Sequence, residues 1–247
     1  MLESSVQRLL SQISAGDVVL DIGGWACPFN RANFVMDAEP FETRGYYQTI
    51  GKPAFQGGST EHFTKHTWLQ RDICDRTPYP FGNKELDVVT CSHVLEDIRD
   101  PLWVCSEMIR ISKRGYIEVP SRLAESCRGW ESPRTAGLTH HRWLIDFDQT
   151  SRSVTFLMKH HMIHSDRRYS FPGSFFSSLG PDQRVSAFFW DDTFEFSERQ
   201  IHGLPGVSAE LEGFVAQHYR YPAWRLAADR VLARAEQQLG RVVRRLG

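Results

Sequence analysis

The fold is decided by the stretch VVLDIGG, residues 18–24. It is a short apolar run that carries one acid, Asp21, and ends in two glycines that permit a tight turn. Such runs are typical of strands buried in a parallel sheet. A second run of this kind, residues 33–37, ends in Asp37. Acids at the carboxyl ends of two successive strands, with a glycine turn after the first, indicate a nucleotide-binding crevice in a doubly wound sheet.

Working outward from this stretch, strand-like and helical segments alternate. Further buried strands are predicted at residues 67–73, 86–92 and 116–120. Amphipathic spacing predicts helices at residues 2–13 and 101–111, the second with Asp100 as its cap and Pro101 in its first turn. This order predicts an α/β domain with a mostly parallel sheet.

The rest of the chain follows another pattern. Residues 38–66 are rich in turn formers and predict a long loop or lid. Residues 141–158 read as an antiparallel hairpin on the sheet edge, which makes seven strands in all, and residues 185–190 suggest a further strand. We therefore expect one domain over residues 1–205 and an amphipathic helical tail over 206–247.

Composition narrows the class of protein. The chain has 247 residues, of which 41% are hydrophobic and 24% are charged, and its formal net charge is -1. These values exclude disordered, collagen-like and rod-like coiled-coil proteins. The five cysteines contain no C-x-x-C pair, and neither a secretory signal nor a membrane span is evident, so we expect reduced thiols and a cytoplasmic protein.

The near-neutral charge hides a basic C-terminal segment. Residues 220–247 hold seven arginines against Asp229 and Glu236. Apolar residues at heptad-like spacing from Ala228 to Leu246 favour docking or a homodimer through this helix, with the arginines solvated. Contact with nucleic acid or anionic lipid is the less favoured alternative.

Over about residues 15–120 the chain resembles the class I S-adenosylmethionine-dependent methyltransferases. In order, the matching motifs are the glycine motif at 18–24, the ribose acid Asp37, the adenine-facing segment 71–73, the fourth strand and its loop at 80–98, and the fifth strand at 115–120. The resemblance implies a Rossmann-like sheet and transfer of a methyl group from S-adenosylmethionine to a hydroxyl of a small molecule or glycan.

The resemblance also assigns roles to particular residues. The implied cofactor-binding residues are Asp21, Gly23, Gly24, Trp25, Asp37, Asp72, Ile73 and Ser92. The candidates for catalysis or substrate contact are His93, His140 and His141, with Glu96 and Glu118 behind them. No metal is expected, and His160, His161 and His164 are interpreted as a polar edge rather than as ligands, because zinc sites need more nearby donors.

Two departures from the family pattern leave alternatives open. Trp25 stands where the family has a glycine, so either the loop runs differently or the indole lines the pocket. Only 16 residues separate Asp21 from Asp37, which predicts no more than a stub of a first helix. A non-catalytic protein that binds a partner or acts as a scaffold is therefore the alternative. A nucleotide-dependent oxidoreductase is disfavoured because the chain has no G-x-G-x-x-G pattern.

Overall fold

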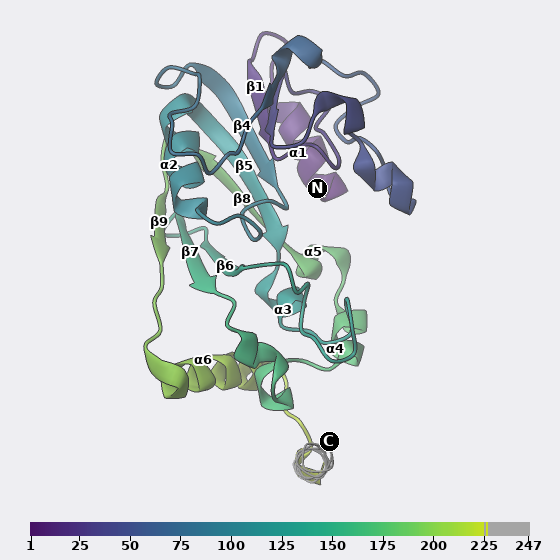
Figure 1. The fold of residues 1–247 in the computed structure, drawn as a ribbon, viewed down its shortest axis with the longest axis vertical. Helices are drawn as coiled ribbons and strands as arrows, with labels where there is room; N and C mark the ends of the chain where they lie inside the picture. Colours follow the sequence, from purple (N-terminus) through teal and green to yellow (C-terminus); the bar gives the residue numbers. More distant parts are fainter. Residues whose placement is uncertain (225, 227–247) are drawn as a thin grey trace, which may run out of the picture. The chain divides into compact units, whose positions relative to one another are not determined.

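The computed structural model describes residues 1–224 and 226, and the chain divides into two compact units (Figure 1). Unit 1 comprises Met1–Ala124, His140–Lys159 and Leu179–Gln200. Unit 2 comprises Glu125–Thr139, His160–Ser178 and Ile201–Gly247. The functional division expected from the sequence, at residue 205, stays a prediction.

The core of unit 1 is a six-stranded sheet in the order β3-β2-β1-β4-β5-β8. Its strands are β1 (Val19–Ile22), β2 (Phe34–Asp37), β3 (Trp68–Gln70), β4 (Leu86–Ser92), β5 (Ser112–Pro120) and β8 (Val185–Asp191). The first five strands of this order run parallel, and β8 pairs antiparallel with β5. The predicted α/β class with a mostly parallel sheet is thus confirmed.

The predictions of seven strands and of an edge hairpin at 141–158 are wrong in detail. The hairpin strands β6 (Trp143–Asp148) and β7 (Ser153–Met158) join β9 (Glu195–Glu198) in a separate three-stranded sheet. The edge next to β5 is occupied by β8 instead. The reason is the hairpin's apolar side chains, which pack face-on against the main core, where Phe147 stacks on Phe188 with ring centroids 5.3 Å apart.

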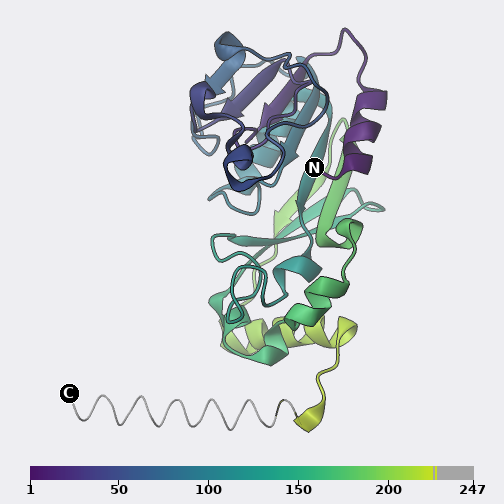
Figure 2. The same cartoon turned by 90° about the vertical axis from the view of Figure 1, so that its right-hand side faces the viewer.

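One helix packs on each face of the central sheet. Figure 2 shows the N-terminal helix, coloured purple, beside the sheet. These helices are α1 (Glu3–Gln12) and α2 (Pro101–Ile111), and both match the predicted ranges closely. Because side chains alternate along a strand, Val19 of β1 packs in the cluster that holds α1, and Leu20 packs in the cluster that holds α2. Asp100 caps α2 by accepting a hydrogen bond from the Trp103 amide.

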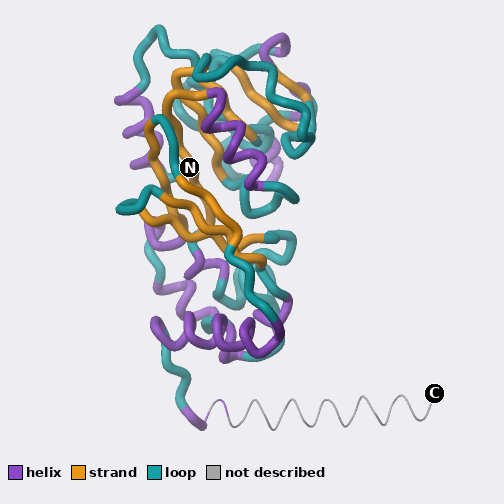
Figure 3. Tube along the Cα trace, turned by 90° about the vertical axis from the view of Figure 1, so that its left-hand side faces the viewer, coloured by secondary structure: helices purple, strands orange, loops and turns teal. Residues whose placement is uncertain are grey.

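The expected stub of a helix between β1 and β2 is absent. The chain forms no helix between β1 and β2, and only short helical turns between β2 and β3; Figure 3 colours helices, strands and loops separately. These turns are η1 (Phe41–Thr43), η2 (Tyr46–Ile50) and η3 (Lys65–Thr67). The reason is that Asp21, rather than a helix, fixes the connection, because its carboxylate accepts a hydrogen bond from the Phe29 amide at 2.9 Å.

The long segment 38–66 is fastened to that connection. The amides of Gly45 and Tyr47 donate to the carbonyls of Trp25 and Ala26 at 2.8 and 3.0 Å. Further along the segment, the Gln56 amide donates to the Pro28 carbonyl. Because of these bonds we call the segment the pinned loop; its predicted role as a lid stays a prediction.

Unit 2 is built from short helices around a small core. Its elements include η4 (His161–His164), η5 (Arg167–Tyr169), α4 (Gly173–Ser178) and α6 (Gly203–His218); α3 (Arg122–Glu125) and α5 (Pro181–Arg184) complete the chain's helices among the described residues. Tyr169 hydrogen-bonds Ser208 of α6 at 2.7 Å, and Phe171 stacks on Phe175. Within the described chain, no helix has both the length and the apolar character needed to cross a membrane.

The structure describes only part of the helical tail predicted over residues 206–247. Helix α6 begins at Gly203, before the predicted tail, and ends at His218. The arginine-rich heptad segment, and with it the proposed homodimer contact, lies outside the described residues. His160 caps the start of η4 by accepting a hydrogen bond from the Met162 amide, and His164 accepts one from the Ala136 amide. The interpretation of these histidines as a polar edge stays a prediction.

Candidate functional site

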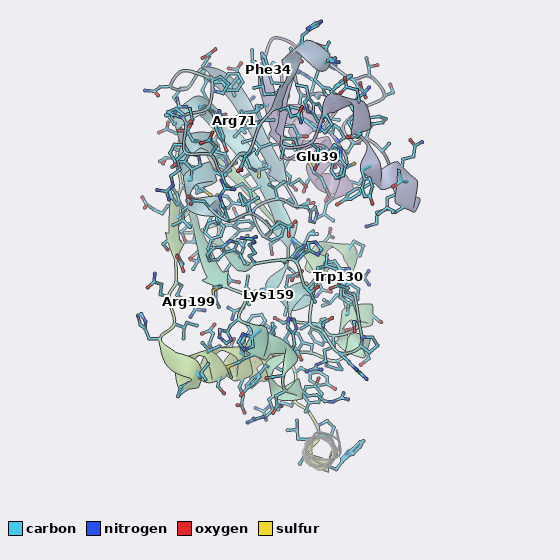
Figure 4. All side chains as sticks on the ribbon, in the orientation of Figure 1. Phe34, Glu39, Arg71, Trp130, Lys159 and Arg199 are labelled. Atoms are coloured by element: carbon cyan, nitrogen blue, oxygen red, sulfur yellow. The ribbon has the colours of Figure 1, made fainter. Side chains whose placement is uncertain are left out.

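The candidate site lies at the carboxyl edge of the central sheet. From β1 the chain passes outward to β2 and β3, and then returns to the other side of β1 for β4 and β5. Such a reversal opens a crevice beyond the carboxyl ends of the two strands beside it, which are β1 and β4 here. In Figure 4, Phe34 marks the start of β2 and Glu39 lies just past its carboxyl end.

The turn after β1 requires glycine for two separate reasons. Gly23 has φ +72°, and a Cβ there would lie 2.2 Å from Cγ2 of Val94. A Cβ on Gly24 would lie 2.3 Å from Oδ2 of Asp21. The Gly23 amide also donates to the Met36 carbonyl at 2.8 Å, which ties the turn to β2. The glycines thus allow the chain to pass close to both β2 and the loop after β4.

Asp21 is turned into the protein. Its residue is 2% exposed, and its carboxylate accepts hydrogen bonds from the Phe29 amide and from the Thr90 hydroxyl at 2.9 and 2.7 Å. Burial raises the pKa of Asp21 to about 6. Its observed contacts position the loop, so any contribution of Asp21 to cofactor binding acts through that loop.

Asp37 lies at the end of β2, and its carboxylate can accept more hydrogen bonds than it does. Its two carboxylate oxygens accept hydrogen bonds from the Trp25 and Glu39 amides, each at 3.0 Å. Burial raises its pKa, against the effect of these amides. Because each carboxylate oxygen has two lone pairs, Asp37 keeps some capacity to accept hydrogen bonds from neighbouring hydroxyls.

The indole of Trp25 is held against the outer strands. It stacks on Tyr46 with ring centroids 4.8 Å apart, and its Nε1 donates to the Thr43 hydroxyl at 2.9 Å. It also packs on the cluster of Val35, Phe63 and Trp68. Its contacts therefore lie on the β2–β3 side of the sheet rather than between β1 and β4.

The predicted adenine-facing pair has two different environments. Asp72 accepts a hydrogen bond from the Cys74 amide and forms an ion pair of 2.6 Å with Arg99. Although burial opposes it, these contacts lower the pKa of Asp72. Ile73 is 7% exposed and belongs to the hydrophobic core. Sequence reasoning missed Arg99, because nothing in the spacing links it to Asp72.

His93 is held between two buried carboxylates. It follows β4 with φ +56°, its Nε2 lies 3.1 Å from Oε1 of Glu118, and its Nδ1 lies 3.6 Å from Oε1 of Glu96. Burial alone would lower its pKa, but the two glutamates raise the pKa of His93 to about 9. Near neutral pH the ring is therefore protonated and cannot accept a proton.

Glu118 is the centre of this network. It accepts hydrogen bonds from the Tyr116 hydroxyl and from the Leu2 amide, in addition to His93. Burial would raise its pKa, but chiefly through His93 the pKa of Glu118 is lowered to about 2. Sequence reasoning had ranked Glu118 behind the histidines, because its partners come from distant parts of the chain.

Stability is expected to fall as pH rises from about 6.5 to 9. The folded-state pKa of His93 lies above its ordinary value of 6.5, so its stabilisation is complete below that pH and is lost as pH passes about 9. One pKa unit corresponds to about 1.4 kcal/mol, and partial exposure of the ring reduces the effect, so we expect a loss on the order of 2 kcal/mol.

Urea unfolding at about pH 6 and about pH 9.5 measures this loss. The variant His93→Asn tolerates positive φ and should lack most of the pH dependence. An equal pH dependence in both chains would show that His93 is not the group responsible.

Two polar atoms near the end of β4 are buried without a hydrogen-bond partner within the described chain. They are Oγ of Ser92 and Oε2 of Glu96. Buried polar atoms are ordinarily satisfied, so atoms of this kind suggest a place for a ligand or water. In the pinned loop, burial raises the pKa of Tyr47, and the charges of Cys27, Glu96 and Asp97 add to this effect.

His140 and His141 come together with Asp97. The Nε2 atoms of His141 and His140 lie 3.5 and 3.9 Å from Oδ1 of Asp97. Asp97 was missed from the sequence, where it lies more than 40 residues from the histidines. The structure thus brings His93 and His141 into the same neighbourhood of the sheet edge, through the loop 93–97.

Comparison with known proteins gives matches in structure only. No family model and no curated protein matches the chain. One similar structure is a chain of the complex between the Haloferax volcanii Trm112 methyltransferase activator and a protein described as a methyltransferase. It is 20% identical, with 47% of this chain and 50% of that chain covered and a TM-score of 0.33.

Two other structures are similar at the same level. An S-adenosylmethionine-dependent methyltransferase from Mesorhizobium loti is 14% identical, with 63% of each chain covered and a TM-score of 0.32. A protein from Bacillus halodurans described as a methyltransferase is 14% identical, with 75% and 93% covered and a TM-score of 0.34. This chain spans about half the length of the Haloferax match. Scores of this size carry no inference about function, which must come from the site.

The sequence motifs lie along one edge of the sheet, in the order that the resemblance requires. Gly23 and Gly24 follow β1, Asp37 ends β2, Asp72 follows β3 and His93 follows β4. The fold is an α/β fold with a mostly parallel central sheet. In this sheet the glycine turn, the acids and the imidazolium follow the strands on either side of the switch between β1 and β4, where open α/β sheets commonly bind ligands.

Proposed function

We propose that this chain transfers a methyl group from S-adenosylmethionine to a hydroxyl of a small molecule or glycan. The observation that carries the proposal is the position of Asp37. This carboxylate ends the strand next to β1, beside the glycine turn, and keeps capacity to accept from a hydroxyl donor. A ribose presents two adjacent hydroxyls.

Other residues along the same edge would hold the remaining parts of the cofactor. The Gly23–Gly24 turn would admit the methionine part, Ser92 Oγ is a buried atom in need of a partner, and Asp72 would face the adenine amine. Adenine contact requires Asp72 to share its carboxylate with Arg99. When bound, S-adenosylmethionine supplies an electrophilic methyl group, so the protein mainly has to position the acceptor.

The acceptor proton must go to a group other than His93, because His93 is already protonated near neutral pH. We assign His93 to positioning and to charge, held by Glu96 and Glu118. His140 and His141 remain the candidates for contact with the acceptor, since they lie beside Asp97 in the same unit as the sheet. The choice of a hydroxyl acceptor rests on the resemblance in sequence.

The alternative of a non-catalytic scaffold has less support. It was motivated by Trp25 in the glycine motif and by the C-terminal heptads. Stacking on Tyr46 and a hydrogen bond to Thr43 account for the indole without obstruction of the turn. The heptad segment lies outside the described residues.

Calorimetry with S-adenosylmethionine and its demethylated product tests the proposal directly. We expect both to bind, and Asp37→Ala to weaken binding about tenfold to a hundredfold, the effect of losing charge-assisted hydrogen bonds of about 1.5–3 kcal/mol. Asp37→Asn should have an intermediate effect.

The matched control is Asp182→Ala, at an exposed position of α5. It should leave the affinity unchanged. No binding to the parent chain at millimolar ligand would overturn the proposed function. Equal affinities for Asp37→Ala and the parent would instead mean that the ribose lies elsewhere.

A further inference from the structure

Two imidazoles and one carboxylate converge within unit 1. The ligand atoms of Asp97, His140 and His141 all lie within 4.8 Å of one another. Both imidazoles approach the same oxygen, Oδ1 of Asp97, with Nε2 atoms at 3.5 and 3.9 Å. These separations are longer than N–H···O hydrogen bonds, which have a mode of about 2.9–3.0 Å.

The separations do suit a shared ion. Two donor atoms at about 2.1 Å from a tetrahedral metal lie about 3.4 Å apart. The separation of 3.5 Å between His141 and Asp97 already has this value, and that of 3.9 Å between His140 and Asp97 needs a shift of about half an ångström. His140 is able to move, because its side chain is 61% exposed.

The backbone on both sides of the cluster is fastened in place. The amides of Arg142 and Trp143 donate to the carbonyl of Glu96 at 2.6 and 3.1 Å, and the indole of Trp143 donates to the carbonyl of Ile98 at 2.9 Å. The acceptors of these bonds, Glu96 and Ile98, lie on either side of Asp97, and the donors are the two residues that follow His141. The acid and the imidazole are therefore held face to face by the fold.

The exposure of the three side chains is graded. His141 is 5% exposed, Asp97 is 39% exposed and His140 is 61% exposed. A metal held by them would have one inner ligand and an open side toward solvent. Catalytic sites with three protein ligands and a free position have this arrangement.

We propose that Asp97, His140 and His141 form a binding site for a divalent transition metal of the zinc type. Two imidazoles and one carboxylate suit Zn²⁺, Co²⁺ or Fe²⁺, whereas Mg²⁺ and Ca²⁺ prefer oxygen ligands. The proposal replaces the expectation from the sequence that the chain has no metal site. It does not depend on methyl transfer, since binding alone defines it.

The test uses the full chain, freed of metal with a chelator and dialysed against Zn²⁺ or Co²⁺. We expect one ion for each chain, with visible absorption from bound Co²⁺ that reports its ligands. His140→Ala should lower the affinity at least about tenfold and change the Co²⁺ spectrum. This variant should fold, because the side chain that it removes is mostly exposed.

The matched control is the double variant His160→Ala/His161→Ala in unit 2. These two rings are also adjacent, with centroids 4.3 Å apart, but no carboxylate joins them in a metal-binding group within the described chain. The control should bind metal as the parent does. Absence of binding to the parent, or an affinity that His140→Ala and His141→Ala both leave unchanged, would overturn the proposal, as would loss of binding in the control alone.

Discussion

Glu118→Ala is expected to lower the free energy of unfolding by about 3–5 kcal/mol, the effect of breaking a buried ion pair by removal of one partner. Glu118 is 1% exposed and accepts hydrogen bonds from Tyr116, Leu2 and His93. The variant leaves the Tyr116 hydroxyl and the imidazolium short of their acceptor. Urea unfolding at neutral pH measures the change.

Two further variants separate the effect of the Glu118 charge from the effect of its packing. Glu118→Gln keeps the shape and an acceptor oxygen, so its loss should be smaller, and the pKa of His93 should fall from about 9 toward its ordinary value in an NMR titration. Glu195→Ala, on an exposed position of β9, should change stability by less than about 0.5 kcal/mol. If Glu118→Ala were as mild as Glu195→Ala, the network would contribute nothing to stability.

Gly23→Ala is expected to cost about 3 kcal/mol of stability. The left-handed backbone conformation contributes about 1–2 kcal/mol for a residue with a Cβ, and overpacking against Val94 adds about 1–3 kcal/mol. The observations behind these two parts are φ +72° and the 2.2 Å approach to Cγ2 of Val94. Gly16→Ala is the control, since a Cβ there has no heavy atom within 4 Å.

A double-mutant cycle with Val94→Ala divides this cost. Removal of the valine methyl groups should relieve the steric part and leave the backbone part, so the two substitutions should be less harmful together than their sum. Strict additivity would contradict the close approach of Gly23 and Val94. Thermal and urea unfolding of the four chains give the four corners of the cycle.

The parallel sheet could be predicted because its strands carry their own signal. The runs at 18–24 and 86–92 are mostly apolar, which is what burial on both faces of a sheet demands. The hairpin at 141–158 was misplaced because alternation shows only that one face of a hairpin is buried. It does not say which surface covers that face, and here Phe188 does.

The acids and glycines of the site could be predicted from the sequence. The residues that contact them were harder to predict. Asp37 lies at a strand end that its own neighbours in sequence define. Asp97 and Glu118 contact their histidines because the fold brings distant strands and loops together. No local sequence pattern indicates these contacts. The pKa of His93 was equally out of reach, because it depends on two glutamates brought to it by the fold.

During synthesis, β1 cannot pair with β4 until the ribosome has made β4. Val19 pairs with Val88, and the segment between them contains β2 and β3. At about 5–20 residues per second, a ribosome needs about 3–14 s to add that segment, and until then β1 lacks its neighbour on the β4 side. The unpaired backbone N–H and C=O groups on that edge of β1 are therefore exposed to chaperones or to other nascent chains for seconds, and non-local parallel pairing of this kind folds slowly even when the chain is complete.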